Sequence, residues 1–120
     1  MFTNYTWRQI LQHIRYLPSN SSGDHLIFIP PKNLLNYVRI SREQIFVATK
    51  EEPDNFVEIP PKYFEAVYNE LVYLKKLPHK NCPNIMNIKF AGIVIAILGQ
   101  LPEVYFDKKK GTLTYIRVKE

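Results

Sequence analysis

The chain has 120 residues, of which 46% are hydrophobic and 22% charged, so we predict one folded domain over residues 1–120 and exclude extensive disorder. Its single cysteine, Cys82, excludes an internal disulfide. The formal net charge is +5, and the first residues lack the basic-then-apolar pattern of a secretion signal. We therefore expect a basic cytoplasmic protein.

The first predicted element is a helix that ends before Pro18. Thr6 is followed three residues later by Gln9, which fits a capping box at the helix start. Apolar residues then recur with helical spacing, and they are Trp7, Ile10, Leu11, Ile14 and Leu17. Residues 19–24 are polar and contain Gly23, so they are predicted to form a loop.

Short strands are predicted next. Residues 25–29 are rich in β-branched and aromatic side chains and are followed by two prolines. Residues 32–38 are weakly specified, and we expect one helical turn there. Residues 44–49 and 55–59 have strand composition, and the charged, turn-prone segment 50–54 between them indicates a hairpin.

The clearest helix in the sequence follows Pro61. Its apolar residues keep a period of about 3.6 residues, and they are Phe64, Val67, Tyr68, Leu71 and Val72. Residues 77–84 are then predicted to form a loop.

Residues 85–98 are compatible with either a buried strand or a buried helix, and we favour the helix because Gly99 and Pro102 follow the run. The apolar part, residues 90–98, is shorter than the roughly 20 residues of a membrane span, so no membrane partner is expected. Residues 104–106 and 112–118 are predicted to pair as a hairpin around the basic turn 107–111.

The predicted fold class is α+β, with a short antiparallel sheet and three main helices. The order of elements over residues 61–118 resembles a winged helix, in which a hairpin with basic residues touches the phosphate backbone. Two features depart from that pattern. The loop at 77–84 is short for the additional helix of a winged helix, and the helix in the recognition position offers only Asn87, Lys89 and Gln100 to base edges. Contacts to phosphates are therefore expected, with poor sequence preference.

The positive charge lies entirely in the second half of the chain. Residues 1–60 hold six basic and six acidic residues, whereas residues 61–120 hold ten basic and five acidic ones. This asymmetry indicates a polyanionic partner, nucleic acid before membrane. The candidate contacts are Lys108, Lys109, Lys110, Lys75, Lys76, Lys80, Lys89, Arg117 and Lys119. The alternative interpretation of the lysine-rich turn is a solvated loop that protects an edge strand from aggregation.

Metal and catalytic motifs are weak. His79 and Cys82 have a suggestive spacing, but a structural zinc site needs four ligands, so no metal is predicted. Asp54 and Asp107 lie in predicted turns and not at the ends of core strands, which argues against a nuclease. The chain has neither a Gly-x-Ser-x-Gly motif nor a glycine-rich phosphate loop. We therefore expect no cofactor and no enzyme activity.

Two functions remain as hypotheses. The first is a non-enzymatic nucleic-acid-binding module, with DNA as the expected ligand and an accessory or regulatory role. The second is a small protein-interaction module, such as a subunit or inhibitor. In that case, exposed aromatic residues and the strands at 44–49 and 55–59 would form a contact edge or a homodimer face.

Overall fold

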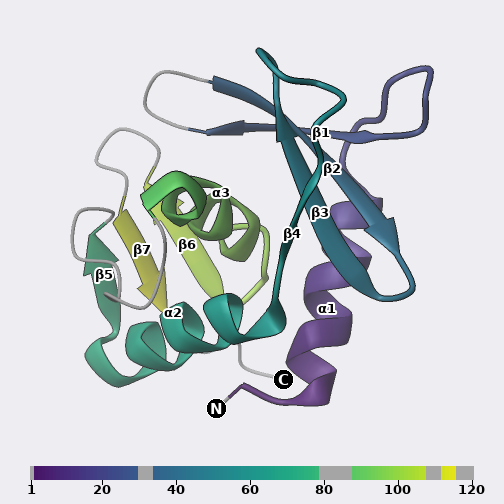
Figure 1. The fold of residues 1–120 in the computed structure, drawn as a ribbon. Helices are drawn as coiled ribbons and strands as arrows, with labels where there is room; N and C mark the ends of the chain where they lie inside the picture. Colours follow the sequence, from purple (N-terminus) through teal and green to yellow (C-terminus); the bar gives the residue numbers. More distant parts are fainter. Residues whose placement is uncertain (1, 30–33, 79–87, 108–111, 116–120) are drawn as a thin grey trace.

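Two antiparallel sheets flank a central helix in the computed structural model (Figure 1). The structure describes residues 2–29, 34–78, 88–107 and 112–115. Within these residues the elements are α1 (Asn4–Arg15), β1 (His25–Ile29), β2 (Leu34–Ser41), β3 (Gln44–Thr49), β4 (Val57–Ile59), α2 (Pro61–Leu74), β5 (Lys76–Pro78), α3 (Ile88–Leu98), β6 (Val104–Asp107) and β7 (Thr112–Tyr115). The predicted single α+β domain with three helices in the described residues is confirmed.

The first sheet has the strand order β1-β2-β3-β4, and all its pairs are antiparallel. Side chains alternate between its two faces. The face turned toward the helices carries Ile27, Val38, Ile45 and Ile59, all of which are buried in the core. The strands predicted at 25–29 and 44–49 are confirmed, as is the hairpin between β3 and β4.

The second sheet has the order β5-β7-β6, so the last strand lies in the middle. β6 and β7 form the predicted hairpin, with Val104 opposite Tyr115 and Asp107 opposite Thr112. β5 pairs antiparallel with β7, with Lys76 opposite Thr114 and Pro78 opposite Thr112. The prediction of a loop at 77–84 was therefore wrong for its first two residues, because pairing with a distant strand makes them extended.

Helix α1 begins earlier than the sequence pattern suggested. Thr3 is the N-cap, where its Oγ1 accepts from the Thr6 backbone N–H at 3.3 Å and its own N–H donates to Thr6 Oγ1 at 3.2 Å. The expected capping box at Thr6 and Gln9 was wrong, because Thr6 is the third helical residue of this earlier box. The apolar stripe is confirmed, since Ile10, Leu11 and Ile14 are buried.

Helix α2 begins at Pro61, where the fixed φ of proline suits the first helical position. Phe64, Val67, Tyr68 and Leu71 form its buried face, which confirms the predicted stripe. Phe64 meets Trp7 of α1 edge to face, with ring centroids 5.4 Å apart. This aromatic contact joins the first two helices of the core.

Helix α3 lies at the centre of the molecule, between the two sheets (Figure 1). Residues 93–98 are all buried, so this half of the helix is covered on every side. It contacts β1, α2 and α1. The helical interpretation of residues 85–98 is confirmed over 88–98. No helix in the described residues is long and apolar enough to cross a membrane.

Residues 34–41 form β2, the longest strand, so the prediction of one helical turn at 32–38 was wrong for residues 34–38. Tertiary contacts explain why this segment is a strand. β2 is hydrogen-bonded to β1 on one side and to β3 on the other, and these pairings override its weak local preference.

Candidate nucleic-acid interface

Lys75 is the only candidate contact whose side-chain exposure is described, and it is exposed. It caps the C-terminus of α2 in the left-handed conformation, at φ 68°, and its N–H donates to the Leu71 carbonyl at 2.7 Å. This conformation turns the chain from α2 directly into β5. A lysine there is unfavourable compared with glycine, because its Cβ crowds the backbone in this region.

The described backbone also shows in which elements Lys76 and Lys89 lie. Lys76 is the first residue of β5, and Lys89 lies in the first turn of α3. The remaining candidates, Lys80, Lys108, Lys109, Lys110, Arg117 and Lys119, lie outside the described residues. The paired residues Asp107 and Thr112 fix the two ends of the segment that contains the lysine triplet.

The helix in the recognition position does not offer a free surface over residues 93–98. These residues pack against β1 and α2, so this half of α3 cannot lie in a nucleic-acid groove without unfolding the core. Gln100, one of the three candidates for base contact, is exposed, and its amide Nε2 donates to the Ala96 carbonyl at 3.4 Å. Asn87 lies outside the described residues.

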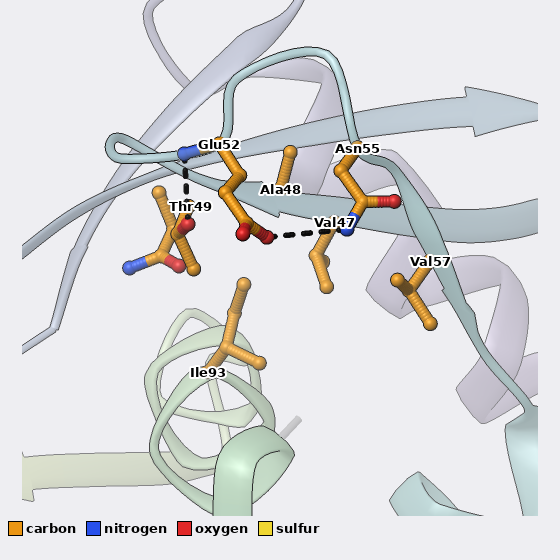
Figure 2. Close-up of a pocket in the computed structure, with 8 residues that line it drawn as sticks. Val47, Ala48, Thr49, Glu52, Asn55, Val57 and Ile93 are labelled. Carbon is orange, nitrogen blue, oxygen red and sulfur yellow. Dashed lines mark hydrogen bonds between the residues drawn. The ribbon is translucent and has the colours of Figure 1, made fainter.

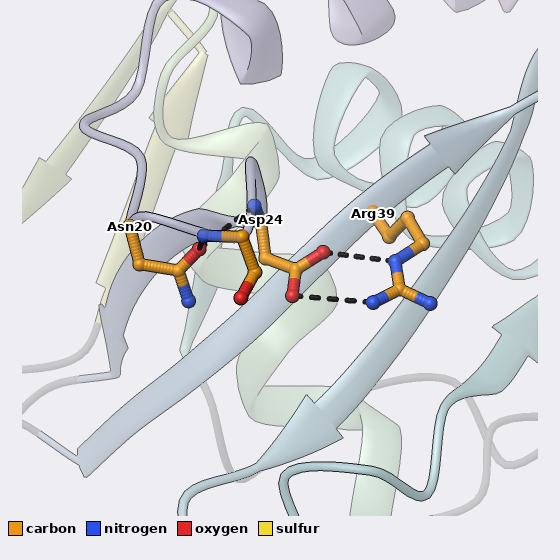
Figure 3. A network of polar contacts seen from close by, with 4 residues as sticks. Asn20, Asp24 and Arg39 are labelled. Atoms are coloured by element: carbon orange, nitrogen blue, oxygen red, sulfur yellow. Dashed lines mark hydrogen bonds and ion pairs between the residues drawn. The ribbon is translucent and has the colours of Figure 1, made fainter.

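Sequence reasoning missed a polar cluster on the other sheet (Figure 3). The Arg39 guanidinium donates to both Asp24 carboxylate oxygens, from Nε at 2.8 Å and from Nη2 at 3.2 Å, and its central carbon lies 3.9 Å from the Phe56 ring centroid. The hydrogen bond to Asp24 raises the pKa of Arg39. Asn20 Oδ1 accepts from the N–H groups of Ser22 and Asp24 and so shapes the loop that holds the carboxylate. Asp24, Arg39 and Phe56 are far apart in sequence, and no local pattern joins them.

Two hollows lie at the first sheet. The smaller lies under the β3–β4 loop, where Ile93 of α3 points toward Glu52 and Asn55 (Figure 2). It encloses about 20 Å³, which is the room of about one water molecule. The larger, about 440 Å³, is an open depression beside Phe28, Leu35 and Lys50. Polar side chains line both hollows, namely Thr49, Lys50 and Glu51 in the larger one and Thr49, Glu52 and Asn55 in the smaller one.

Metal-ligating residues do not cluster in the described part of the chain. Comparison of this chain with protein-family models, with curated proteins and with solved structures gives no match. The case for a function therefore depends on the chain's own residues and geometry.

Proposed function

We propose that this chain is a non-enzymatic nucleic-acid-binding module, with DNA as its expected ligand, whose C-terminal half is arranged as a winged helix. The observation that carries the proposal is the strand order β5-β7-β6, in which a strand after α2 joins the β6–β7 hairpin behind α3. A winged helix connects its elements in this order. The hairpin would be the wing, and the segment between its strands contains Lys108, Lys109 and Lys110.

The register of the second sheet orders the basic residues along the proposed surface. Pro78 lies opposite Thr112, so β5 runs toward the end of the sheet at which the hairpin turns. Lys76 is opposite Thr114, about 7 Å farther from that end at the usual rise of a strand. We assign the lysine triplet to the first contact with phosphates. Lys75 and Lys76 would contribute a second, weaker layer of charge, and Lys80, Lys89, Arg117 and Lys119 complete the candidate set.

Phosphate contact is favoured over base reading because residues 93–98 of α3 are buried. Three ammonium groups on a turn would release counterions from the nucleic acid, and this attraction has no sequence preference. A protein that binds phosphates without sequence preference suits an accessory or regulatory role. Enzyme activity forms no part of the proposal, since the sequence contains no recognised catalytic motif.

Fluorescence anisotropy with a labelled random duplex tests the proposal. We expect binding at about 50 mM salt and a loss of affinity of at least about tenfold by 200 mM. A single-stranded oligonucleotide of the same length, measured in parallel, distinguishes duplex from single-strand preference. Absence of binding to either ligand at about 50 mM salt would refute the proposal.

A second candidate function, the protein-interaction module, is favoured by one separate observation. The first sheet carries large apolar side chains, among them the exposed Phe28, on the face that the described helices do not cover.

A further inference from the structure

The larger hollow lies where the ladder between β2 and β3 stops. β2 pairs with β3 only over residues 36–41, whereas its first two residues, Leu34 and Leu35, pair with β1. Both leucines line the hollow, and so do Lys50 and Glu51, which follow the end of β3. The hollow therefore opens at the place that a longer β3 would fill. Its volume of about 440 Å³ is within the range of small-molecule sites.

Leu35 brings an unpaired peptide edge to this place. Ser41 and Gln44 flank the two-residue turn between β2 and β3, so they form a hydrogen-bonded pair. Counting back along β2 in steps of two from Ser41 reaches Leu35, whose N–H and C=O consequently point to the side of β3. Pairing with β3 ends one residue earlier, so these two groups face no described strand. One backbone donor and one acceptor are left, which is enough for a single ligand but not for an added strand.

Asn36 contributes a polar side chain that both hollows share. It is only 8% exposed. Its Nδ2 donates to the Leu34 carbonyl at 3.2 Å, and its Oδ1 accepts no hydrogen bond from the described residues. Fully buried side-chain oxygens of the described residues all have a partner, so Oδ1 lies at the wall of the hollow. This arrangement favours a ligand with a hydrogen-bond donor.

The rest of the lining is amphipathic. Phe28 and Leu34 supply apolar surface and are 53% and 54% exposed. Lys50 and Glu51 supply one positive and one negative charge, both exposed, and neither forms an ion pair with a described residue. The hollow thus combines a cation, an anion, a free peptide edge and an apolar wall.

We propose that the larger hollow binds a free α-amino acid with a large aliphatic or aromatic side chain. The Lys50 ammonium and the Leu35 N–H hold the carboxylate of the ligand. Its ammonium group donates to the Glu51 carboxylate and to Asn36 Oδ1, and its side chain covers the exposed ring of Phe28. A zwitterion satisfies both charges of the lining, whereas a ligand with a single charge leaves one of them without a partner. Because the hollow is open and the ligand is small, we expect a dissociation constant of about 0.1–1 mM.

A nuclear magnetic resonance titration with phenylalanine, without nucleic acid, tests this proposal independently of the proposed function. Three analogues each lack one group of the ligand: phenethylamine lacks the carboxylate, 3-phenylpropionate lacks the amine and glycine lacks the side chain. We expect each analogue to bind at least about fivefold more weakly than phenylalanine. Absence of saturable binding of phenylalanine and of leucine up to about 10 mM would overturn the proposal, and so would an analogue that binds as tightly as phenylalanine.

Substitutions at exposed positions locate the site without disturbing the core. Lys50→Met and Glu51→Gln each remove one charge from the hollow and should weaken phenylalanine binding about two- to fivefold, the effect of one exposed ion pair. Lys62→Met and Glu65→Gln make the same changes at exposed positions of α2 and should leave binding unchanged. Circular dichroism verifies that each variant is folded. Phenylalanine binding that neither Lys50→Met nor Glu51→Gln weakens would contradict the assignment of this hollow.

Discussion

Replacing Phe64 by alanine removes the aromatic ring that joins the first two helices. Phe64 is fully buried and packs edge to face against Trp7 at 5.4 Å between ring centroids. Truncation of a buried phenylalanine costs about 3–5 kcal/mol, of which the aromatic pair accounts for about 0.5–1.5 kcal/mol. A domain of 120 residues has an unfolding entropy of about 0.25 kcal/mol/K, so we expect the midpoint of thermal unfolding to fall by about 12–20 °C.

Thermal unfolding followed by circular dichroism measures this change, with urea unfolding as an independent check. Tyr73→Ala lies on the same helix at a side chain that is 79% exposed, and it should shift the midpoint by about 2 °C or less. Both substitutions place alanine in α2, so helix propensity favours both. If the midpoint falls equally for the two variants, the placement of Phe64 in the core is wrong.

Three further substitutions have defined outcomes. Thr3→Ala should lower the free energy of unfolding by about 1 kcal/mol in urea titrations, because it removes the cap of α1, and an unchanged value would place the helix start elsewhere. Lys75→Gly should raise that free energy by about 0.5–1 kcal/mol, because glycine tolerates the left-handed conformation at φ 68°; a loss of stability would contradict this geometry. Arg39→Lys should lower the unfolding temperature, because lysine cannot reproduce the two-point contact with Asp24 or the stacking on Phe56. The pKa of Arg39 is raised in the folded state, so this contribution is complete at every pH below the ordinary arginine pKa. The effect of Arg39→Lys should therefore be the same at pH 6 and pH 9, and a marked difference would contradict it.

The sequence predicted those elements whose periodicity is local and strong. The stripes of α1 and α2 and the strands β1 and β3 contain enough apolar residues to reveal their period. The segments that it missed depend on distant partners. β2 is a strand because β1 and β3 flank it, and β5 has only three residues, which become extended by pairing with β7 across the chain.

The candidate sites also differ in how much of each could be predicted from the sequence alone. Charge asymmetry is a property of composition, so the basic second half was visible in the sequence, but composition does not say whether its residues converge. The apolar side chains on the face of the first sheet away from the helices were hidden because residues 32–38 were interpreted as one helical turn. Once β2 is a strand, Leu35 and Tyr37 align with Phe28 and Ala48, and an apolar surface results. The Asp24–Arg39 pair needs the β1–β2 register, which no local motif contains.

The salt dependence of duplex binding by two matched triple variants tests the central claim most directly. One variant replaces Lys108, Lys109 and Lys110 by alanine, and the other replaces Arg8, Arg15 and Lys50, which are exposed in the first half of the chain. Both lose three positive charges, so a difference between them reports position and not net charge. We predict that the first variant lowers the slope of log affinity against log salt by roughly 0.9 for each lost phosphate contact, while the second leaves it near the wild-type value. Equal slopes for the two variants would contradict binding through the hairpin.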